Sequence, residues 1–324
     1  MSCDPELVGV FDSGIGGLTV VSAIRQRRPD LRLLYVADQA HVPYGDRSLD
    51  EVAGYAKGIS TFLVAQGCGS IVMACNISSA VARDEVASAY PELPVLGVLA
   101  GGASSAVRLW EETGGPIGVL ATSGTVKSGA YVSAISALAP EAEVLQVECP
   151  DLVPLIENGE EETPRMLARC MEYLEPLSDA ECRIVILGCT HYPLGLSALR
   201  VAAMRLFDEE PVFVDPALAA AEALAAALDA SFLAQESEPQ ENARPRSTRL
   251  LTTRSVGSFR RQVRRILPDL ADSIVGAVWN SAGEIEELPP PVTQGHSRHK
   301  VRSASSGLQR SLNGQPDVPS PRDT

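Results

Sequence analysis

Residues 68–75 read CGSIVMAC, and residues 182–189 read CRIVILGC. Both segments begin and end with cysteine and carry an apolar run between. A second pair, residues 8–11 and 117–120, repeats in the same order and at nearly the same spacing. Segments that recur in this way predict two related α/β lobes. On these residues alone, chance similarity between short apolar strands stays open as the alternative.

Strand-like and helix-like segments alternate in the first part of the chain. Short apolar runs predict strands, and apolar residues at helical spacing predict helices. We expect strands at 7–11, 31–37 and 70–74, and helices at 18–27, 49–66 and 78–89. Because this alternation is typical of parallel sheets covered by helices, the sequence predicts an α/β fold with a parallel sheet in each of two pseudo-symmetric lobes.

Length and composition narrow the class of protein. The 324 residues, of which 45% are apolar, are enough for one large or two ordinary domains. A net charge of −14 argues against nucleic acid as a main partner, because the phosphate backbone would be repelled. The N-terminus lacks the features of a secretory signal, and no run of about 18 apolar residues is present. We therefore expect a cytoplasmic protein without a membrane span.

Residues that hold cofactors are scarce. The seven cysteines include no Cys-x-x-Cys pair, which disfavours a disulfide framework, a zinc knuckle or a redox dithiol. Of the four histidines, His296 and His299 fall in a polar tail, so we expect no metal site. Pyridoxal phosphate needs a Schiff-base lysine beside a phosphate site. The chain has three lysines and no P-loop, so we expect no cofactor.

Two cysteines stand where predicted strands end. Cys75 is followed by Asn76, and Cys189 by Thr190 and His191, so polar residues replace the apolar run at each point. Ligands of open parallel sheets bind beyond the carboxyl ends of strands, where helix N-termini also lower the pKa of a thiol. Two facing lobes would place the thiols on opposite sides of one cleft. Such a pair suits inversion at one carbon, since one group removes a proton and the other adds one to the opposite face.

Several motifs, in order along the chain, resemble the glutamate racemase family. The likeness runs from about residue 7 to about residue 270 and leaves out the polar stretch 234–246. Each motif alone is short, but together they are specific. They are residues 12–18 (DSGIGGL), 43–45 (PYG), 74–76 (ACN), 121–126 (ATSGTV), 149–157 (CPDLVPLIE) and 187–194 (LGCTHYPL).

The resemblance implies a fold, a reaction and a substrate. The first lobe would comprise residues 1–97 and 212–285 and the second residues 98–211. The tail at 286–324 lies outside the resemblance, and its polar, proline-rich composition predicts disorder. Cys75 and Cys189 would carry the Cα proton of glutamate without a cofactor, in a cleft between the lobes. The product D-glutamate would serve peptidoglycan synthesis. The family also leads us to expect a homodimer.

The resemblance also implies roles for residues around the first thiol. Asp12 would tune that thiol or hold the substrate ammonium, although a helix N-cap is the alternative. Ser13 and Asn76 would hydrogen-bond the substrate carboxylate or ammonium. The turn at Tyr44 and Gly45 would offer N–H groups to a carboxylate, unless it is an ordinary turn led by proline.

Further residues are implied around the second thiol. Thr190 would offer a hydroxyl, and His191 would orient or activate the cysteine. Thr122 and Thr125 follow the first strand of the second lobe and would contact substrate. Glu157 resembles a family carboxylate near this thiol, with a solvated position on a helix face as the alternative.

One residue departs from the family pattern. Where the family has threonine two residues after the first catalytic cysteine, this chain has Ile77. A hydrogen bond from that hydroxyl to a charged carboxylate would be worth about 1.5–3 kcal/mol, although the backbone N–H of Ile77 remains. Three alternatives therefore stay open: an aspartate racemase, a hydantoin racemase, and a paralogue that binds an amino acid without turnover. The two thiols disfavour the last, because binding alone needs neither.

Overall fold

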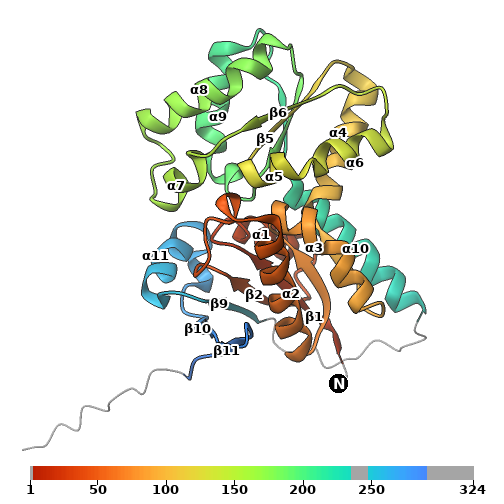
Figure 1. The fold of residues 1–324 in the computed structure, drawn as a ribbon, viewed down its shortest axis with the longest axis vertical. Coiled ribbons are helices and arrows are strands. Elements are labelled where there is room, and N and C mark those ends of the chain that lie inside the picture. The colour runs from red at the N-terminus through yellow and green to blue at the C-terminus, as the bar shows by residue number, and fades with distance from the viewer. Residues whose placement is uncertain (1–2, 235–246, 290–324) are drawn as a thin grey trace, which may run out of the picture. The chain divides into compact units, whose positions relative to one another are not determined.

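The computed structural model describes residues 3–234 and 247–289 (Figure 1). Seven strands form the first sheet: β1 Asp4–Asp12, β2 Arg32–Ala37, β3 Cys68–Met73, β4 Val95–Gly97, β9 Thr248–Thr252, β10 Ile274–Trp279 and β11 Ile285–Glu287. Their order is β11-β10-β9-β2-β1-β3-β4, and neighbours run parallel except β10 and β11. Residues 8–12 of β1 are all buried, as expected for a parallel strand covered on both faces.

Four strands form the second sheet: β5 Ile117–Ala121, β6 Val144–Glu148, β7 Ile184–Gly188 and β8 Val212–Val214. All run parallel, in the order β6-β5-β7-β8. This order copies β2-β1-β3-β4 of the first sheet, and the two repeated cysteine segments correspond to β3 and β7. The predicted α/β fold, with a parallel sheet in each of two related lobes, is confirmed.

Two predicted boundaries need correction. Residues 212–214, predicted in the first lobe, pair with β7 of the second sheet, because the Val212 N–H donates to the Arg183 carbonyl at 2.8 Å. Residues 286 and 287, predicted in the tail, belong to β11. The rest of the expected tail from residue 290, with its two histidines, and the stretch 235–246 lie outside the described residues. With these shifts, we propose the division into lobes that the sequence predicts.

Helices cover both sheets in Figure 1. Those between strands of the first sheet are α1 Leu18–Arg27, α2 Leu49–Ala65, α3 Asn76–Ala89 and α11 Val256–Ile266, with the short η1 Tyr44–Asp46 and η3 Pro268–Leu270. The second lobe has α5 Ser123–Ser128, α6 Ala130–Leu138, α7 Leu152–Glu157, α8 Pro164–Asp179, η2 Tyr192–Gly195 and α9 Leu196–Leu206. The chain passes between lobes twice, at α4 Val98–Thr113 and α10 Pro216–Ala234.

Local sequence explains where two helices begin. Ser48 and Glu51 form a capping box that starts α2, since each side chain accepts a hydrogen bond from the backbone N–H of the other. Helix α3 starts at Asn76, two residues before the expected start at residue 78. The reason is that Cys75 has extended backbone angles and occupies the N-cap. The first of the two thiols thus stands at a helix N-terminus.

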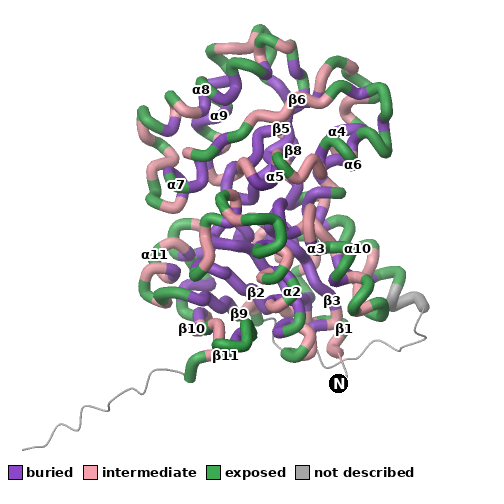
Figure 2. The backbone as a smooth tube through the Cα atoms, viewed as in Figure 1, coloured by how far each residue is buried: buried purple, intermediate pink, exposed green. Residues whose placement is uncertain are grey.

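The two crossing helices join the lobes through apolar packing. Helix α10 packs against α4 and α1, and the largest apolar cluster contains side chains of both lobes, including Val10, Leu187 and Leu224. Figure 2 shows buried residues along strands of both sheets, β2 and β5 among them. Within the described ranges, no helix has the length and apolar character needed to cross a membrane.

Replacing Leu224 by alanine should lower the free energy of unfolding by about 2–5 kcal/mol, because it removes a fully buried side chain from this cluster. Urea unfolding followed by circular dichroism measures the change. Leu218 lies on the same helix but is 60% exposed, so Leu218→Ala should change stability by no more than about 0.5 kcal/mol. Equal effects of the two substitutions would contradict the packing role of α10.

Candidate active site

A cavity lies at the carboxyl ends of both sheets. The residues that follow β1 and β3 line it from the first lobe, and the residues that follow β5 and β7 line it from the second. Of the residues predicted from the sequence, all but Glu157 line this cavity. They are Asp12, Ser13, Tyr44, Gly45, Cys75, Asn76, Ile77, Thr122, Thr125, Cys189, Thr190 and His191.

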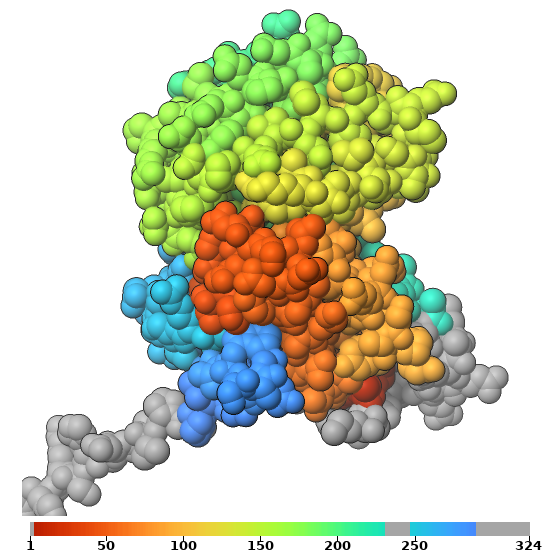
Figure 3. Space-filling view, viewed as in Figure 1, coloured from red at the N-terminus to blue at the C-terminus, as the bar shows by residue number. Residues whose placement is uncertain are grey.

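The loop that contains η1 forms one side of the cavity. Residues 42–46 line it, and η1 contacts α5 of the second lobe. In Figure 3 the orange surface around this loop abuts the yellow surface around α5. The Tyr44 hydroxyl donates to Asp38 Oδ2 at 2.6 Å and therefore already has a partner in the first lobe. A Cβ on Gly45 would lie 3.0 Å from the Thr122 Cβ, so glycine permits this close contact between lobes.

Cys75 is buried, with 6% of its surface exposed, at the N-terminus of α3. Burial raises the pKa of its thiol, and the negative charge of Asp12 raises it further. The amide and hydroxyl of Ser78, three residues later in the first turn of α3, act in the opposite direction. The environment of Cys75 therefore holds the proton on sulfur until another group stabilises the thiolate.

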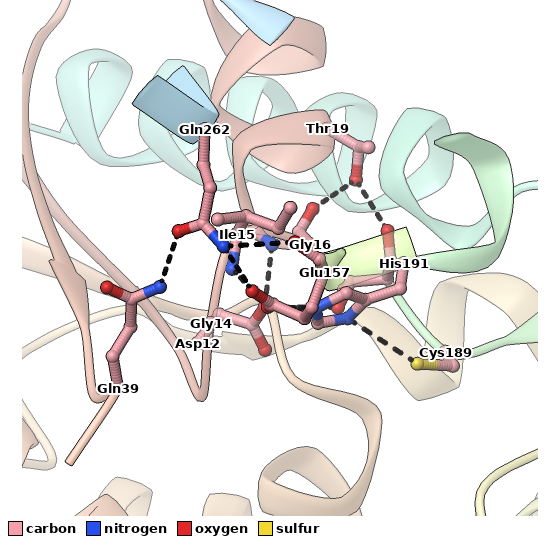
Figure 4. A network of polar contacts seen from close by, with 12 residues as sticks. Asp12, Gly14, Ile15, Gly16, Thr19, Gln39, Glu157, Cys189, His191 and Gln262 are labelled. Carbon is pink, nitrogen blue, oxygen red and sulfur yellow. Dashed lines mark hydrogen bonds and ion pairs between the residues drawn. The ribbon is translucent and has the colours of Figure 1, made fainter. Parts of the chain in front are cut away.

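Cys189 lies beside a histidine, whereas Cys75 lies at a helix N-terminus. Its Sγ lies 3.8 Å from Nδ1 of His191, and Nε2 of that ring lies 2.8 Å from Oε1 of Glu157 (Figure 4). Burial disfavours the charged imidazole, but the hydrogen bonds to Cys189 and Glu157 outweigh burial and hold the pKa of His191 well above its usual range. Burial likewise opposes ionisation of Glu157, yet its hydrogen bond to His191 lowers the pKa of the carboxyl. The protonated imidazole therefore places a cationic hydrogen-bond donor beside the Cys189 sulfur.

Asp12 joins the two lobes at the floor of the cavity. It is fully buried, and its Oδ2 accepts hydrogen bonds from the Gly17 N–H at 2.6 Å and the Thr190 hydroxyl at 3.1 Å. Its Oδ1 is buried and has no hydrogen-bond partner among the described residues. The N-cap of α1 is Gly17, without a side-chain cap, so the N-cap alternative for Asp12 does not hold. The free oxygen can accept a hydrogen bond from a ligand cation.

Asn76, Thr122 and Thr125 are the other polar side chains of the cavity with defined hydrogen bonds. Asn76 Oδ1 accepts from the Tyr131 hydroxyl of α6 at 2.7 Å, while its Nδ2 is buried without a partner in the part of the chain described. The hydroxyls of Thr122 and Thr125 lie 3.1 Å apart. Ile77 presents an apolar side chain that touches Gly124, since a Cβ on that glycine would overlap Ile77 Cδ1.

The glycine-rich turn after β1 packs directly on the second lobe. A Cβ on Gly14 would lie 2.6 Å from Glu157 Oε1, and one on Gly16 would lie 2.5 Å from His191 Nδ1. The Ile15 N–H donates to Glu157 Oε1 at 3.3 Å. Glycines in the turn therefore let the first lobe reach the His191–Glu157 pair.

Comparison with known proteins places the chain in a family. The family model described as Asp/Glu/Hydantoin racemase matches residues 19–224. This chain belongs to that racemase family. A glutamate racemase of Desulforudis audaxviator is 47% identical to this racemase over 212 residues, which cover 65% of this chain and 75% of the relative. A glutamate racemase of Syntrophus aciditrophicus is 42% identical over 231 residues, covering 71% of this chain and 83% of the relative.

Solved structures with the same fold agree. A glutamate racemase isoform from Bacillus anthracis superposes with a TM-score of 0.73 at 32% identity, covering 81% of this racemase and 94% of that chain. A glutamate racemase from Francisella tularensis, solved in complex with D-glutamate, gives a TM-score of 0.72 at 30% identity, covering 82% and 94%. Within the described residues of this racemase, no group of three or more His, Cys, Asp and Glu side chains is arranged to hold a metal ion.

The sequence predictions left out several side chains around the thiols of this racemase, among them Ser78, Gln39 and Gln262. Ser78 could have been found from its position, three residues after the N-cap Cys75, because the third residue of a helix turns its N–H toward the N-cap side chain. Gln39 and Gln262 carried no signal, since their places near Glu157 depend on contacts between segments far apart in the sequence. Glu157 itself lies behind His191 and outside the cavity.

Replacing Gly16 by alanine should lower racemase activity at least about tenfold, because a Cβ there overlaps the Thr190 hydroxyl and the His191 ring and pushes the lobes apart. Steady-state kinetics measure the loss. A Cβ on Gly54 would meet no other group within 4 Å, so Gly54→Ala serves as the matched control with normal activity. Normal activity of Gly16→Ala would show that this contact between lobes is dispensable.

Replacing Glu157 by glutamine should lower the pKa of His191, because the neighbouring negative charge is removed. In the unchanged protein the ring should stay protonated as the pH rises past 6.5, the ordinary value for histidine. NMR titration of the ring, assigned with a His191→Gln variant, measures both values. An identical titration curve in Glu157→Gln would rule out the coupling of the two groups.

Proposed function

We propose that this racemase interconverts L-glutamate and D-glutamate by moving the Cα proton between Cys75 and Cys189. The observation that carries the proposal is the single cavity to which each lobe contributes one thiol from the carboxyl end of a corresponding strand. Two acid/base groups from two lobes can act on opposite faces of one carbon. Inversion of that carbon needs one proton removed and one delivered.

The proton balance of the reaction closes on the two thiols. The thiolate of one cysteine takes the Cα proton, and the bond electrons move into the substrate carboxylate to form a planar carbanion. The thiol of the other cysteine then gives its proton to the opposite face of Cα. At the end the two cysteines have exchanged protonation states, so the enzyme is ready for the reverse direction.

The neighbours of each thiol have matching tasks in the proposal. The free Oδ1 of Asp12 accepts a hydrogen bond from the substrate ammonium, beside Cys75. The free Nδ2 of Asn76 donates to a substrate carboxylate, together with hydroxyls such as those of Ser13 and Thr122. The protonated ring of His191 stabilises the Cys189 thiolate when that cysteine is the base.

The relatives support glutamate as the substrate. Those with 40–47% identity carry the name glutamate racemase, and the Francisella structure holds D-glutamate. D-Glutamate made in the cytoplasm would supply peptidoglycan synthesis, and the family resemblance adds a homodimer to the proposal. Ile77 replaces a hydroxyl of the family pattern, and the backbone and side-chain donors of Asn76 and its neighbours would hold the carboxylate in its place.

Cys75→Ala and Cys189→Ala should each lower racemisation by about a hundred- to ten-thousandfold, because each removes one acid/base group. NMR in D₂O with purified enantiomers, without added cofactor, measures deuterium entry at Cα, and polarimetry measures loss of optical rotation. Cys182→Ala is the matched control, since Cys182 opens the same repeated segment but is absent from the cavity.

Each outcome of the exchange experiment leads to one conclusion. Full activity of either thiol variant would refute the two-thiol reaction. Exchange into aspartate or a hydantoin, with none into glutamate, would keep the reaction and change the substrate. No exchange into any of these, from folded and reduced protein, would identify a binding paralogue.

A further inference from the structure

Glu157 is held from behind by the first lobe. While its Oε1 faces His191, its Oε2 accepts a hydrogen bond from the Gln262 side chain of α11 at 2.6 Å. Gln262 Oε1 in turn accepts from Gln39 Nε2 at 2.9 Å, and Gln39 Oε1 accepts from the Thr252 hydroxyl of β9 at 3.0 Å. Figure 4 shows the two glutamines, Glu157, the histidine ring and Cys189 in one line of polar contacts. We refer to Thr252, Gln39 and Gln262 as the amide relay.

The chemistry of the groups fixes the direction of the amide relay. An ionised carboxylate only accepts hydrogen bonds, so Gln262 must turn its NH₂ toward Glu157 and its oxygen toward Gln39. Gln39 must then turn its NH₂ toward Gln262 and its oxygen toward Thr252. The Thr252 hydroxyl accepts from the Arg254 N–H at 3.3 Å, so its single proton is available for Gln39.

The amide relay lies outside the cavity that contains the thiols. None of its three residues lines the cavity with the thiols. Gln39 and Gln262, with Glu157, line a second cavity. Gln39 and Thr252 are nonetheless buried, and a buried polar chain with every member paired is costly to break.

Glu157 is therefore a second carboxylate, besides Asp12, that couples the two lobes. Glu157 belongs to the second lobe, yet both of its oxygens accept hydrogen bonds from the first, from Ile15 and from Gln262. Gln262 also contributes to the lowered pKa of the Glu157 carboxyl. Cys75 is supported differently in the described part of the chain: its neighbour Ser78 belongs to the same helix, and Asp12 reaches the other lobe through Thr190 alone.

We propose that Gln262, oriented by Gln39 and Thr252, is a positioning residue that holds Glu157 against His191 and thereby sets the reactivity of the Cys189 thiol. The inference rests on the two-thiol reaction proposed above, since only there does the reactivity of Cys189 limit turnover. Contacts from the first lobe thus support the thiol of the second lobe, whereas Cys75 depends mainly on groups of its own lobe.

The test uses the two cysteines as each other's reference. Gln262→Leu should slow iodoacetamide alkylation of Cys189 about tenfold relative to Cys75, both measured by mass spectrometry on the full chain, because a hydrogen bond to a charged group is lost. Leucine is chosen over alanine because the second cavity would let water replace a deleted amide. Thr252→Val keeps the shape of the buried side chain, removes the start of the relay, and should give a smaller change in the same direction.

A matched control distinguishes loss of the Gln262 amide from a general loosening of α11 against the second lobe. Arg265 lies on α11 one turn beyond Gln262 and pairs with Glu161 of the second lobe, without touching the amide relay. Arg265→Leu should leave the ratio of the two alkylation rates unchanged. An equal change in Arg265→Leu, or no change in both Gln262→Leu and Thr252→Val when circular dichroism shows folded protein, would overturn the proposal.

Isotope effects on the two enantiomers provide a second test, whose expected result a merely structural role of Gln262 would not produce. Because the two enantiomers have equal free energy, kcat/KM must fall equally in both directions in any variant. In Gln262→Leu the isotope effect with α-deuterated substrate should rise for one enantiomer only, the one that Cys189 deprotonates. Equal isotope effects for both enantiomers would count against the proposal.

The inference and the proposed function can fail separately. Slower alkylation of Cys189 with unchanged racemisation would uphold the positioning role of Gln262 and refute Cys189 as a proton carrier. Loss of activity in Cys189→Ala with an unchanged alkylation ratio in the relay variants would do the reverse.

Discussion

The active site depends on a buried carboxylate that accepts hydrogen bonds from both lobes. Asp12 ends β1, an interior strand of the first sheet, and accepts hydrogen bonds from the Gly17 N–H of its own lobe and the Thr190 hydroxyl of the other. Thr190 follows Cys189 directly, so this contact sets the place of the second thiol relative to the first strand. Burying a carboxylate is costly unless it is hydrogen-bonded, and the pair of hydrogen bonds to Oδ2 of Asp12 is complete only when the lobes meet, while Oδ1 is left for a ligand.

Related backbones carry unlike surroundings for the two thiols. Both sheets have the same strand order, and each thiol follows the corresponding strand. Cys75 then begins a long helix, whereas Cys189 leads into the short η2, and His191 supplies the positive charge that a helix N-terminus would otherwise give. A racemase must have equal kcat/KM for two mirror-related substrates, but the two faces of Cα meet different protein groups. The two cysteines do the same chemistry on opposite faces of Cα, so each needs its own set of neighbouring protein groups.

The sequence predicted what depends on local pattern. Alternating segments and the repeated cysteine strands were enough for the α/β fold, and the polar residues after Cys75 and Cys189 marked the cavity. The position of β8 was missed because the family resemblance set the lobe boundary only roughly, and a strand of three residues carries too little pattern to correct it. Gln262 was missed for another reason: its partner Glu157 lies 105 residues away, and no spacing rule joins a helix of one lobe to the end of a helix in the other.

The order of strands in the first sheet has a consequence for synthesis on the ribosome. Strand β2 pairs on one side with β1 and on the other with β9, which is made more than two hundred residues later. Until then the edge of β2 presents unpaired backbone groups, which is a hazard for pairing with other chains. The second lobe has already emerged when β9 and α11 arrive. Because β9, α11, β10 and β11 all follow residue 247, the first sheet is completed and Gln262 reaches the second lobe only late in synthesis. A nascent chain therefore lacks the support proposed for its second thiol until almost all of the fold has been made.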